Sequence, residues 1–193
     1  MTIGIDIDDV ITSTIELVAE YAKKHFGSND SELIRKILHS KTIEGNLLTF
    51  YKKYLIEMME NYQLKENSKE VIDRLKDKGY KIILITARGY TPQEGIRETT
   101  TNYLSNNDIY YDEIVFGAMD KSIICKEKNI DILIDDSIDN LESIRDTKTT
   151  PILFNSEINQ SIDTDFTRVF NWLELEKYIE NFISKTKNNI KQD

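Results

Sequence analysis

The chain has 193 residues, and 25 Lys and Arg stand against 34 Asp and Glu, which gives a formal charge of −9. This length accommodates one domain of ordinary size with room for a modest insertion. No apolar run approaches the roughly 18 residues of a membrane span, and the acidic excess excludes the basic face that a nucleic-acid polymer would need.

The first predicted element is a buried strand at Thr2–Asp8, where isoleucines recur at every second position. Further apolar runs predict strands at Tyr80–Thr86, Glu113–Phe116, Ile130–Asp135, Pro151–Asn155 and Arg168–Phe170. Helices are expected between them at Ser68–Lys78, Pro92–Ser105, Asp120–Lys128, Ile138–Arg145 and Trp172–Ser184. Strands that alternate with helices predict an α/β fold, with a Rossmann-like, doubly wound parallel sheet covered on both faces.

The interval between the first two core strands is too long for a single crossover. Eighty residues separate Asp6 from Thr86, whereas a strand–helix–strand unit needs about 30. The surplus contains helical patterns at Thr14–Phe26, Ser31–Leu38 and Glu44–Tyr62. We therefore expect a small helical cap at residues 15–65, inserted after the first strand, a core formed by residues 1–14 and 66–185, and a polar tail at 186–193.

Polar residues gather where the predicted strands end. They are Asp6, Asp8 and Asp9 after the first strand, Thr86-Ala87-Arg88 after the second, Lys121 after the third, and Asp135-Asp136 after the fourth. In a parallel sheet these ends share one edge, where ligands bind. Five carboxylates at one edge repel strongly and persist only when a hard divalent cation, Mg²⁺ in the first instance, neutralises them. Shared coordination would place Asp6 within about 6 Å of Asp135.

These residue types suit phosphoryl transfer through a covalent aspartyl phosphate. Asp6 is the candidate nucleophile. Asp8, two residues on, is the candidate general acid and base, which protonates the leaving oxygen and later activates water. Thr86 and Ala87 are expected to bind the phosphoryl oxygens, and Lys121 to supply a positive charge beside them.

The residues Asp6-Ile7-Asp8, Thr86, Lys121 and Asp135-Asp136 resemble, in this order, the four motifs of the haloacid dehalogenase (HAD) superfamily of phosphohydrolases. The resemblance covers the whole predicted core. It implies a Mg²⁺ ion held by Asp6, the backbone carbonyl of Asp8, and Asp135. Asp136 is then either a further ligand or the holder of a bound water.

Within this superfamily the chain looks most like the 5′(3′)-deoxyribonucleotidases and their bacterial relatives. The early Asp6 motif, the helical insertion, the Ile-Thr-Ala-Arg sequence around Thr86 and the Asp-Asp-Ser-Ile-Asp-Asn run from Asp135 carry this resemblance. It implies a phosphomonoester hydrolase, a 5′-nucleotidase on (deoxy)nucleoside monophosphates whose cap reads the base. These relatives usually carry glycine where this chain has Asp9, a carboxylate expected to change how the cap lies over the site.

Two of the basic residues have a second interpretation. Arg88 is a candidate substrate contact, but a surface ion pair is about equally expected. Lys126 and Lys128 share a helix with Lys121, which is favoured only by its position at the helix start.

Other residues are expected to be structural. Phe50, Tyr51 and Tyr54 are candidates to stack on a base, although their helical spacing favours packing within the cap. His25 and His39 are not spaced as metal ligands, and we interpret them as cap or surface residues.

Three other functions use parts of this pattern. A HAD phosphatase acting on a sugar phosphate or another small phosphorylated metabolite would keep the same chemistry. A signalling receiver domain also uses an Asp, a Thr, a Lys and an acidic pair, but it carries the acidic pair on its first strand. A catalytically silent binding scaffold is disfavoured because every catalytic group is present.

The expected partner is a small phosphorylated metabolite, with no nucleic-acid polymer and no membrane. Cys125 is the single cysteine and is interpreted as a core thiol, so a reducing compartment fits. The N-terminus runs directly into a strand and lacks a signal-peptide pattern. We therefore expect a cytoplasmic protein, either a monomer or a homodimer.

Overall fold

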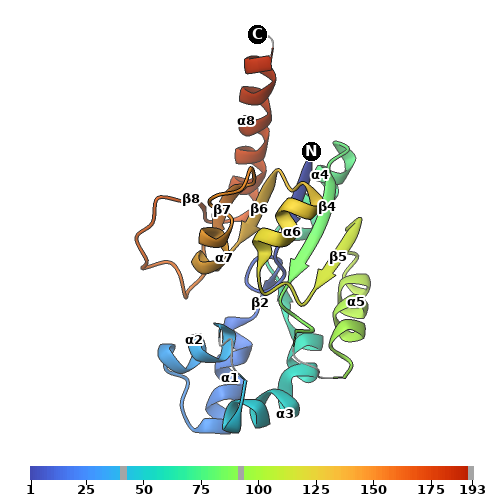
Figure 1. Ribbon diagram of the computed structural model, residues 1–193. Coiled ribbons are helices and arrows are strands. Elements are labelled where there is room, and N and C mark those ends of the chain that lie inside the picture. Colours follow the sequence, from blue (N-terminus) through green and yellow to red (C-terminus); the bar gives the residue numbers. More distant parts are fainter. Residues whose placement is uncertain (40–42, 91–93, 191–193) are drawn as a thin grey trace.

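A six-stranded sheet forms the centre of the computed structural model, which describes residues 1–39, 43–90 and 94–190 (Figure 1). The strands are β1 (Thr2–Ile5), β4 (Lys81–Thr86), β5 (Glu113–Phe116), β6 (Ile132–Asp135), β7 (Thr150–Phe154) and β8 (Thr167–Val169). Their spatial order is β5-β4-β1-β6-β7-β8, and every neighbouring pair is parallel. The early strand β1 therefore lies in the middle of the sheet.

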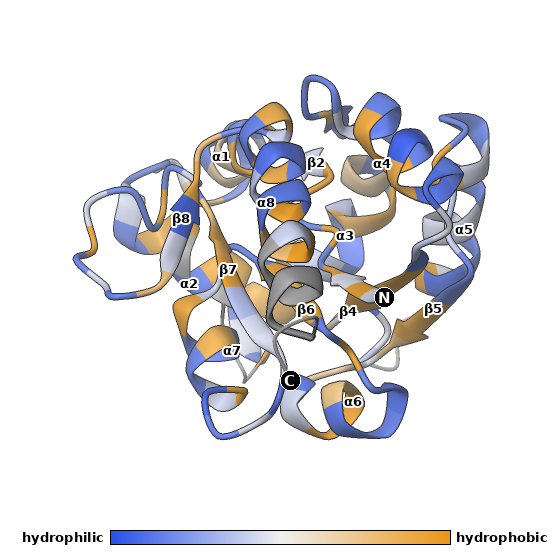
Figure 2. Ribbon diagram, turned by 90° about the horizontal axis from the view of Figure 1, so that it is seen from above, coloured by the Kyte–Doolittle hydropathy of each residue, from blue (hydrophilic) through white to orange (hydrophobic). Residues whose placement is uncertain are grey.

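Helices cover both faces of this sheet. They are α4 (Ser68–Asp77), α5 (Ile96–Asn106), α6 (Lys121–Lys128), α7 (Ile138–Ser143) and α8 (Trp172–Ile190). On β4, Ile82 and Leu84 join the core formed with α4, α5 and α8, while Ile83 and Ile85 join the core formed with α6 and α7. Figure 2 shows α4 and α6 on opposite sides of the strands. The predicted doubly wound α/β sheet is confirmed.

The register of β1 with its neighbours aligns the strand ends. Ile5 pairs with Leu84 of β4 and with Ile134 of β6, so the three strands finish at nearly the same level. Immediately beyond, the Asp6 N–H donates to the Ile134 carbonyl at 2.9 Å. Thr86 and Asp135, which are 80 and 129 positions after Asp6 in the chain, are thereby brought to the same edge of the sheet.

Three helices form a separate group beyond this edge, which we call the cap (Figure 1). They are α1 (Ile15–Phe26), α2 (Ser31–His39) and α3 (Gly45–Asn61). Two short antiparallel strands, β2 (Thr12–Ser13) and β3 (Gln63–Leu64), lie where the chain enters and leaves the cap.

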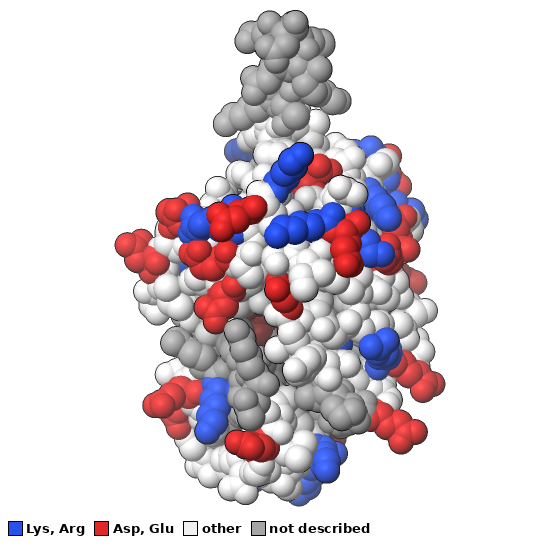
Figure 3. Space-filling model, viewed as in Figure 1, with Lys and Arg blue, Asp and Glu red and all other residues white. Residues whose placement is uncertain are grey.

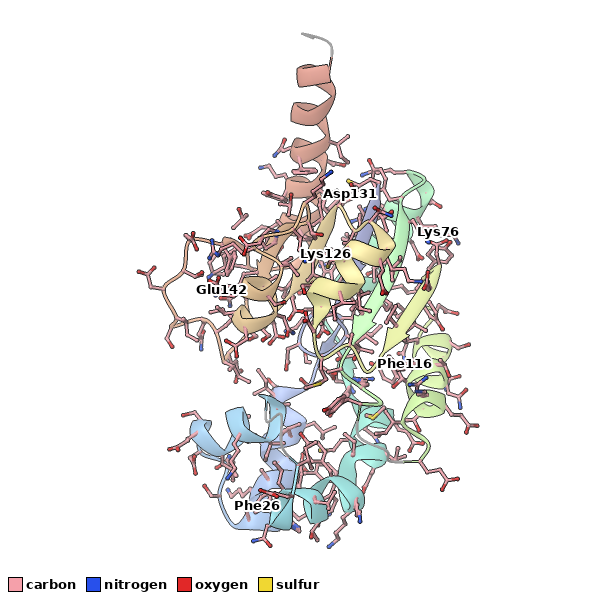
Figure 4. All side chains as sticks on the ribbon, in the orientation of Figure 1. Phe26, Lys76, Phe116, Lys126, Asp131 and Glu142 are labelled. Atoms are coloured by element: carbon pink, nitrogen blue, oxygen red, sulfur yellow. The ribbon has the colours of Figure 1, made fainter. Side chains whose placement is uncertain are left out.

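The interior of the cap is aromatic. Phe50 and Tyr54 are buried, with ring centroids 5.3 Å from Phe26 and 5.1 Å from Tyr21 respectively. His25 lies edge-on to Phe50 at 5.6 Å. Figure 4 labels Phe26 in this cluster, well away from the sheet. The packing interpretation is therefore confirmed for Phe50 and Tyr54, and His25 is a cap residue; the side chain of His39 lies outside the described residues.

The element boundaries differ from the prediction in a few places. Strand β1 ends at Ile5 rather than Asp8, because the chain turns there and Ile11 N–H donates back to the Ile7 carbonyl. Helix α8 continues to Ile190, past the predicted end at Ser184. Helix α5 begins at Ile96, after Gly95 with its φ of +86°; residues 92 and 93 of the predicted helix lie outside the described residues.

Two further expectations concern the environment of the protein. Cys125 is buried, as a core thiol should be. Within residues 1–39, 43–90 and 94–190, no helix combines the length and the apolarity needed to cross a membrane.

Trp172 connects α8 to the turn that follows β1. Its side chain is fully buried, its ring lies 5.9 Å from Phe154, and its Nε1–H donates to the Val10 carbonyl at 2.9 Å. We expect Trp172→Phe to reduce the free energy of unfolding by about 1–3 kcal/mol, because it removes a buried hydrogen bond. Urea denaturation followed by circular dichroism measures this. The control is Leu173→Ala on the same helix, an exposed position where a change under about 0.5 kcal/mol is expected; equal losses for both variants would contradict the prediction.

Candidate active site

Three buried carboxylates meet at the carboxyl edge of the sheet. Asp6 follows β1, Asp135 ends β6, and Asp136 is the next residue. One oxygen from each lies within 4.8 Å of the others. The separation expected of Asp6 and Asp135, under about 6 Å, is therefore met.

Lys121 joins two of these carboxylates. It is the first residue of α6, a helix whose N-cap Asp120 accepts a hydrogen bond from the Ser122 N–H. Its Nζ lies 2.5 Å from an oxygen of Asp6 and 2.5 Å from an oxygen of Asp135, and the side chain is only 1% exposed. Burial opposes the charged form, but the two carboxylates outweigh it and raise the pKa of Lys121, so the ammonium remains protonated.

The other lysines of α6 lie elsewhere. Lys128 pairs with Glu113, and Lys126 is exposed on the outer side of the helix (Figure 4). Of the three lysines considered, only Lys121 is directed into the carboxylate cluster.

The cluster is short of positive charge. Asp6, Asp135 and Asp136 with Lys121 carry a formal charge of −2. Burial raises the pKa of Asp6 to about 7; Lys121 opposes the rise, and the negative charges of Asp135 and Asp8 add to it. Burial and the neighbouring Asp9, Asp135 and Asp6 also raise the pKa of Asp136. A cation at this position would favour the ionised forms of all these groups.

The donor set fits a divalent cation. Its members are hard carboxylate oxygens, the ligands that Mg²⁺ and Ca²⁺ prefer. The formal charge of −2 also matches a divalent ion.

Two asparagines that the sequence analysis did not identify support these acids. Asn140 Nδ2 lies 3.2 and 3.1 Å from the two oxygens of Asp135, one of which also accepts from the Ser137 N–H at 2.8 Å. Asn159 Nδ2 donates to the Asp136 carbonyl at 2.8 Å. Asn140 is the last residue of the Asp-Asp-Ser-Ile-Asp-Asn run that begins at Asp135, and this run is the signal by which the sequence could have indicated it.

The Asp8 side chain forms an ion pair with Arg88. Arg88 Nη2 lies 2.6 Å from one oxygen of Asp8, and Nε lies 2.9 Å from the other. The Asp8 side chain is 37% exposed, but that of Arg88 is only 7% exposed. Arg88 therefore forms an ion pair, but a buried one and not the surface pair that was expected, and its contact with substrate stays a prediction.

The remaining predicted phosphate contacts lie beside this pair. Thr86 ends β4 and is buried, and its Oγ1 accepts a hydrogen bond from the Arg88 N–H at 3.1 Å. Ala87 and Arg88 line the cavity described below.

A cavity of about 230 Å³ separates this edge from the cap. Its polar side includes Asp8, Asp9, Asp136 and Asn140. Its apolar side comes from the cap and includes Val18, Ile37, Leu55, Met58 and Met59. Tyr51 also lines it and donates a hydrogen bond to the Ile37 carbonyl. A ligand would fit this cavity if its anionic group lay at the sheet edge and its apolar part lay under the cap.

Comparison with known proteins identifies the family. Residues 1–187 match the family described as 5′ nucleotidase, deoxy (pyrimidine), cytosolic type C protein. The chain belongs to this family. It is 30% identical to the candidate nucleotidase YqfW of Bacillus subtilis (strain 168), over 94% of each chain. It is also 30% identical to a 5′(3′)-deoxyribonucleotidase of the same organism, over 66% of this chain and 68% of that one.

The fold is shared with solved HAD structures. A haloacid dehalogenase-like hydrolase from Streptococcus pneumoniae, SP0104, superposes with a TM-score of 0.67 at 16% identity, covering 92% of this chain and 97% of the other. This nucleotidase is thus a phosphohydrolase with the HAD fold, and its buried carboxylate cluster offers ligands for a divalent metal. The receiver-domain and binding-scaffold alternatives are excluded.

Charged side chains of both signs lie on one face of the molecule. Acidic and basic side chains are interspersed on the face seen in Figure 3, and among the described residues on that face no basic patch is visible.

Asn140 provides a test of how the metal site is supported. We expect Asn140→Ala to weaken divalent-cation affinity by about 10- to 100-fold, because Asp135 loses the amide that orients it. Isothermal titration with Mg²⁺ and Mn²⁺ measures this. Asn102→Ala, which removes an exposed amide from α5, is the matched control and should leave the affinity unchanged; unchanged affinity in Asn140→Ala would refute the orienting role.

Proposed function

We propose that this protein is a Mg²⁺-dependent 5′-nucleotidase that hydrolyses (deoxy)nucleoside monophosphates through an aspartyl phosphate on Asp6. The observation that carries this proposal is the cluster of Asp6, Asp135 and Asp136 around Lys121, of which Asp136 also lines the cavity beneath the apolar roof. The nucleotidase relatives support the choice of substrate.

The substrate would lie with its phosphate at the sheet edge. The Thr86 hydroxyl, the Ala87 N–H and the Lys121 ammonium are the donors proposed to bind the phosphoryl oxygens. Asp6, Asp135, Asp136 and the Asp8 carbonyl would hold the Mg²⁺ ion. When bound, this cation supplies positive charge that reduces the repulsion between the Asp6 carboxylate and the phosphate.

The first half-reaction transfers the phosphoryl group. A carboxylate oxygen of Asp6 attacks phosphorus, the ester P–O bond breaks, and the leaving oxygen takes a proton from Asp8. Asp6 is positioned for attack by its hydrogen-bonded Lys121, which also compensates its charge. The nucleoside leaves with its hydroxyl restored.

The second half-reaction regenerates the enzyme. Asp8, now ionised, accepts a proton from a water molecule as the water oxygen attacks phosphorus. The bond between phosphorus and the Asp6 oxygen breaks, which releases inorganic phosphate and the free Asp6 carboxylate. The cap is proposed to limit the access of other water, because aliphatic and methionine side chains line the cavity on that side.

The dimensions of the cavity favour a small metabolite. Its volume of about 230 Å³ is below the roughly 300–1,000 Å³ of drug-sized pockets. The apolar roof suits a base and a deoxyribose better than a polyhydroxylated sugar, because sugar hydroxyls would be buried without partners.

A cytoplasmic location and a monomeric or homodimeric state remain predictions from the sequence.

A substrate screen tests the proposal. Purified protein should hydrolyse deoxy- and ribonucleoside monophosphates with Mg²⁺ present, lose this activity with a chelator, and regain it when Mg²⁺ is restored. Phosphate release from glucose 6-phosphate and other sugar phosphates is measured in parallel. If kcat/KM is higher for the sugar phosphates than for the nucleoside monophosphates, the proposed substrate class is wrong and the protein is a sugar phosphatase.

The two catalytic aspartates are separable by mutation. Asp6→Asn should lower kcat by about 10³-fold or more while the fold stays intact, because only the nucleophile is lost. Asp8→Asn should slow both half-reactions but leave Mg²⁺ affinity nearly unchanged, since the proposed metal contact is its backbone carbonyl. Phosphate-release kinetics and isothermal titration measure these effects. Near-normal turnover in Asp6→Asn, or a large loss of Mg²⁺ binding in Asp8→Asn, would reject the assigned roles.

A further inference from the structure

Arg88 is enclosed on three sides by groups from different parts of the fold. The carboxylate of Asp8 receives two of its N–H groups, at 2.6 and 2.9 Å. The ring of Tyr62, at the end of the cap, has its centroid 5.6 Å from the guanidinium carbon. Thr100 of α5 places its Oγ1 3.5 Å from Nη1. These contacts join β1, β4, the cap and α5 at one side chain.

The pair with Asp8 fixes both partners in one orientation. A guanidinium that binds both oxygens of a carboxylate constrains its plane as well as its position. The Arg88 side chain is only 7% exposed, whereas that of Asp8 is 37% exposed. Arg88 is therefore the rigid member of the pair, and Asp8 is the member whose direction depends on it.

We propose that Arg88 is a positioning residue for Asp8 rather than a phosphate-binding residue. This inference rests on the proposed function, in which Asp8 gives a proton to the leaving oxygen. Arg88 holds the Asp8 carboxylate at the wall of the cavity, which both residues line. Arg88 also contacts Tyr62, the residue that follows α3 at the end of the cap. The position of the Asp8 carboxylate therefore depends on this end of the cap as well.

Such a role predicts a dependence on the leaving group. An alkoxide is a poor leaving group and needs the proton of Asp8, whereas p-nitrophenolate leaves readily without it. Removing a group that acts through Asp8 should therefore lower kcat more for an alkyl phosphate than for p-nitrophenyl phosphate. Removing a group that binds the phosphate should lower the rate equally for both substrates, because their phosphate groups are the same.

The experiment compares Arg88→Met and Arg88→Lys with the wild-type enzyme. The alkyl substrate is thymidine 5′-monophosphate or, should the wild type not hydrolyse it, glucose 6-phosphate. We expect Arg88→Met to lower kcat for the alkyl substrate by about 100-fold, the lower end of the range for general acid catalysis, and kcat for p-nitrophenyl phosphate by less than about 10-fold. The inhibition constant of inorganic phosphate should change less than about 2-fold.

Arg88→Lys guards against a folding defect in Arg88→Met. Lysine keeps the charge but lacks the planar fork, so we expect the same leaving-group dependence with a smaller loss. Arg74→Met is the matched control, since Arg74 makes a comparable pair with Glu176 at 2.7 Å on the α4–α8 side of the sheet. It should leave both rates and the phosphate inhibition constant unchanged.

Three results would overturn the inference. Equal losses for both substrates with weaker inhibition by phosphate would make Arg88 a phosphate ligand. Wild-type rates in both Arg88 variants would leave it without a catalytic role, and full activity in Arg88→Lys alone would show that charge suffices. Asp8→Asn is measured beside them: if it shows no leaving-group dependence, the acid role in the proposed function fails, which is a separate outcome.

Discussion

The buried charges around Lys121 are the constraint on which the rest of this molecule depends. Taking three carboxylates and an ammonium out of water costs several kcal/mol per ion, and the cost is recovered only when the geometry is close to ideal. Lys121 lies 2.5 Å from both Asp6 and Asp135, which satisfies one oxygen of each. Burial raises the pKa values of Asp6 and Asp136, and a cation bound at this edge would favour their ionised forms.

The parallel sheet makes this arrangement possible. Charged groups are tolerated at the carboxyl ends of strands because the strand bodies bury apolar side chains on both faces, and the polar residues lie just beyond them. Asp6 and Asp135 are adjacent because β1 pairs directly with β6. Thr86 arrives on the other side because β1 also pairs with β4. The central position of β1 therefore places Asp6, the proposed nucleophile, between Asp135, a proposed metal ligand, and Thr86, a proposed phosphate-binding residue.

The residues that lie at strand ends could be predicted from the sequence. The contacts that depend on the direction of a side chain could not. The positions of Asp6, Thr86 and Asp135 follow from apolar runs that stop at them, so their convergence was predictable. The Asp8–Arg88 pair and the Asn140 contact were not, because both lie in turns or on a helix whose orientation is set by tertiary packing. Strands of two residues, such as β2 and β3, show no period that a sequence pattern could reveal.

Asp9 shows how a departure from the family pattern is accommodated. Its φ is +55°, in the left-handed region that favours glycine, which explains the glycine expected here in related enzymes. Aspartate is among the residues that tolerate this region, because its side chain can bond locally. Here both its oxygens accept hydrogen bonds from Thr14, one from the N–H at 3.0 Å and one from the hydroxyl. Thr14 directly precedes α1, so the carboxylate that replaces glycine ties the catalytic turn to the first helix of the cap.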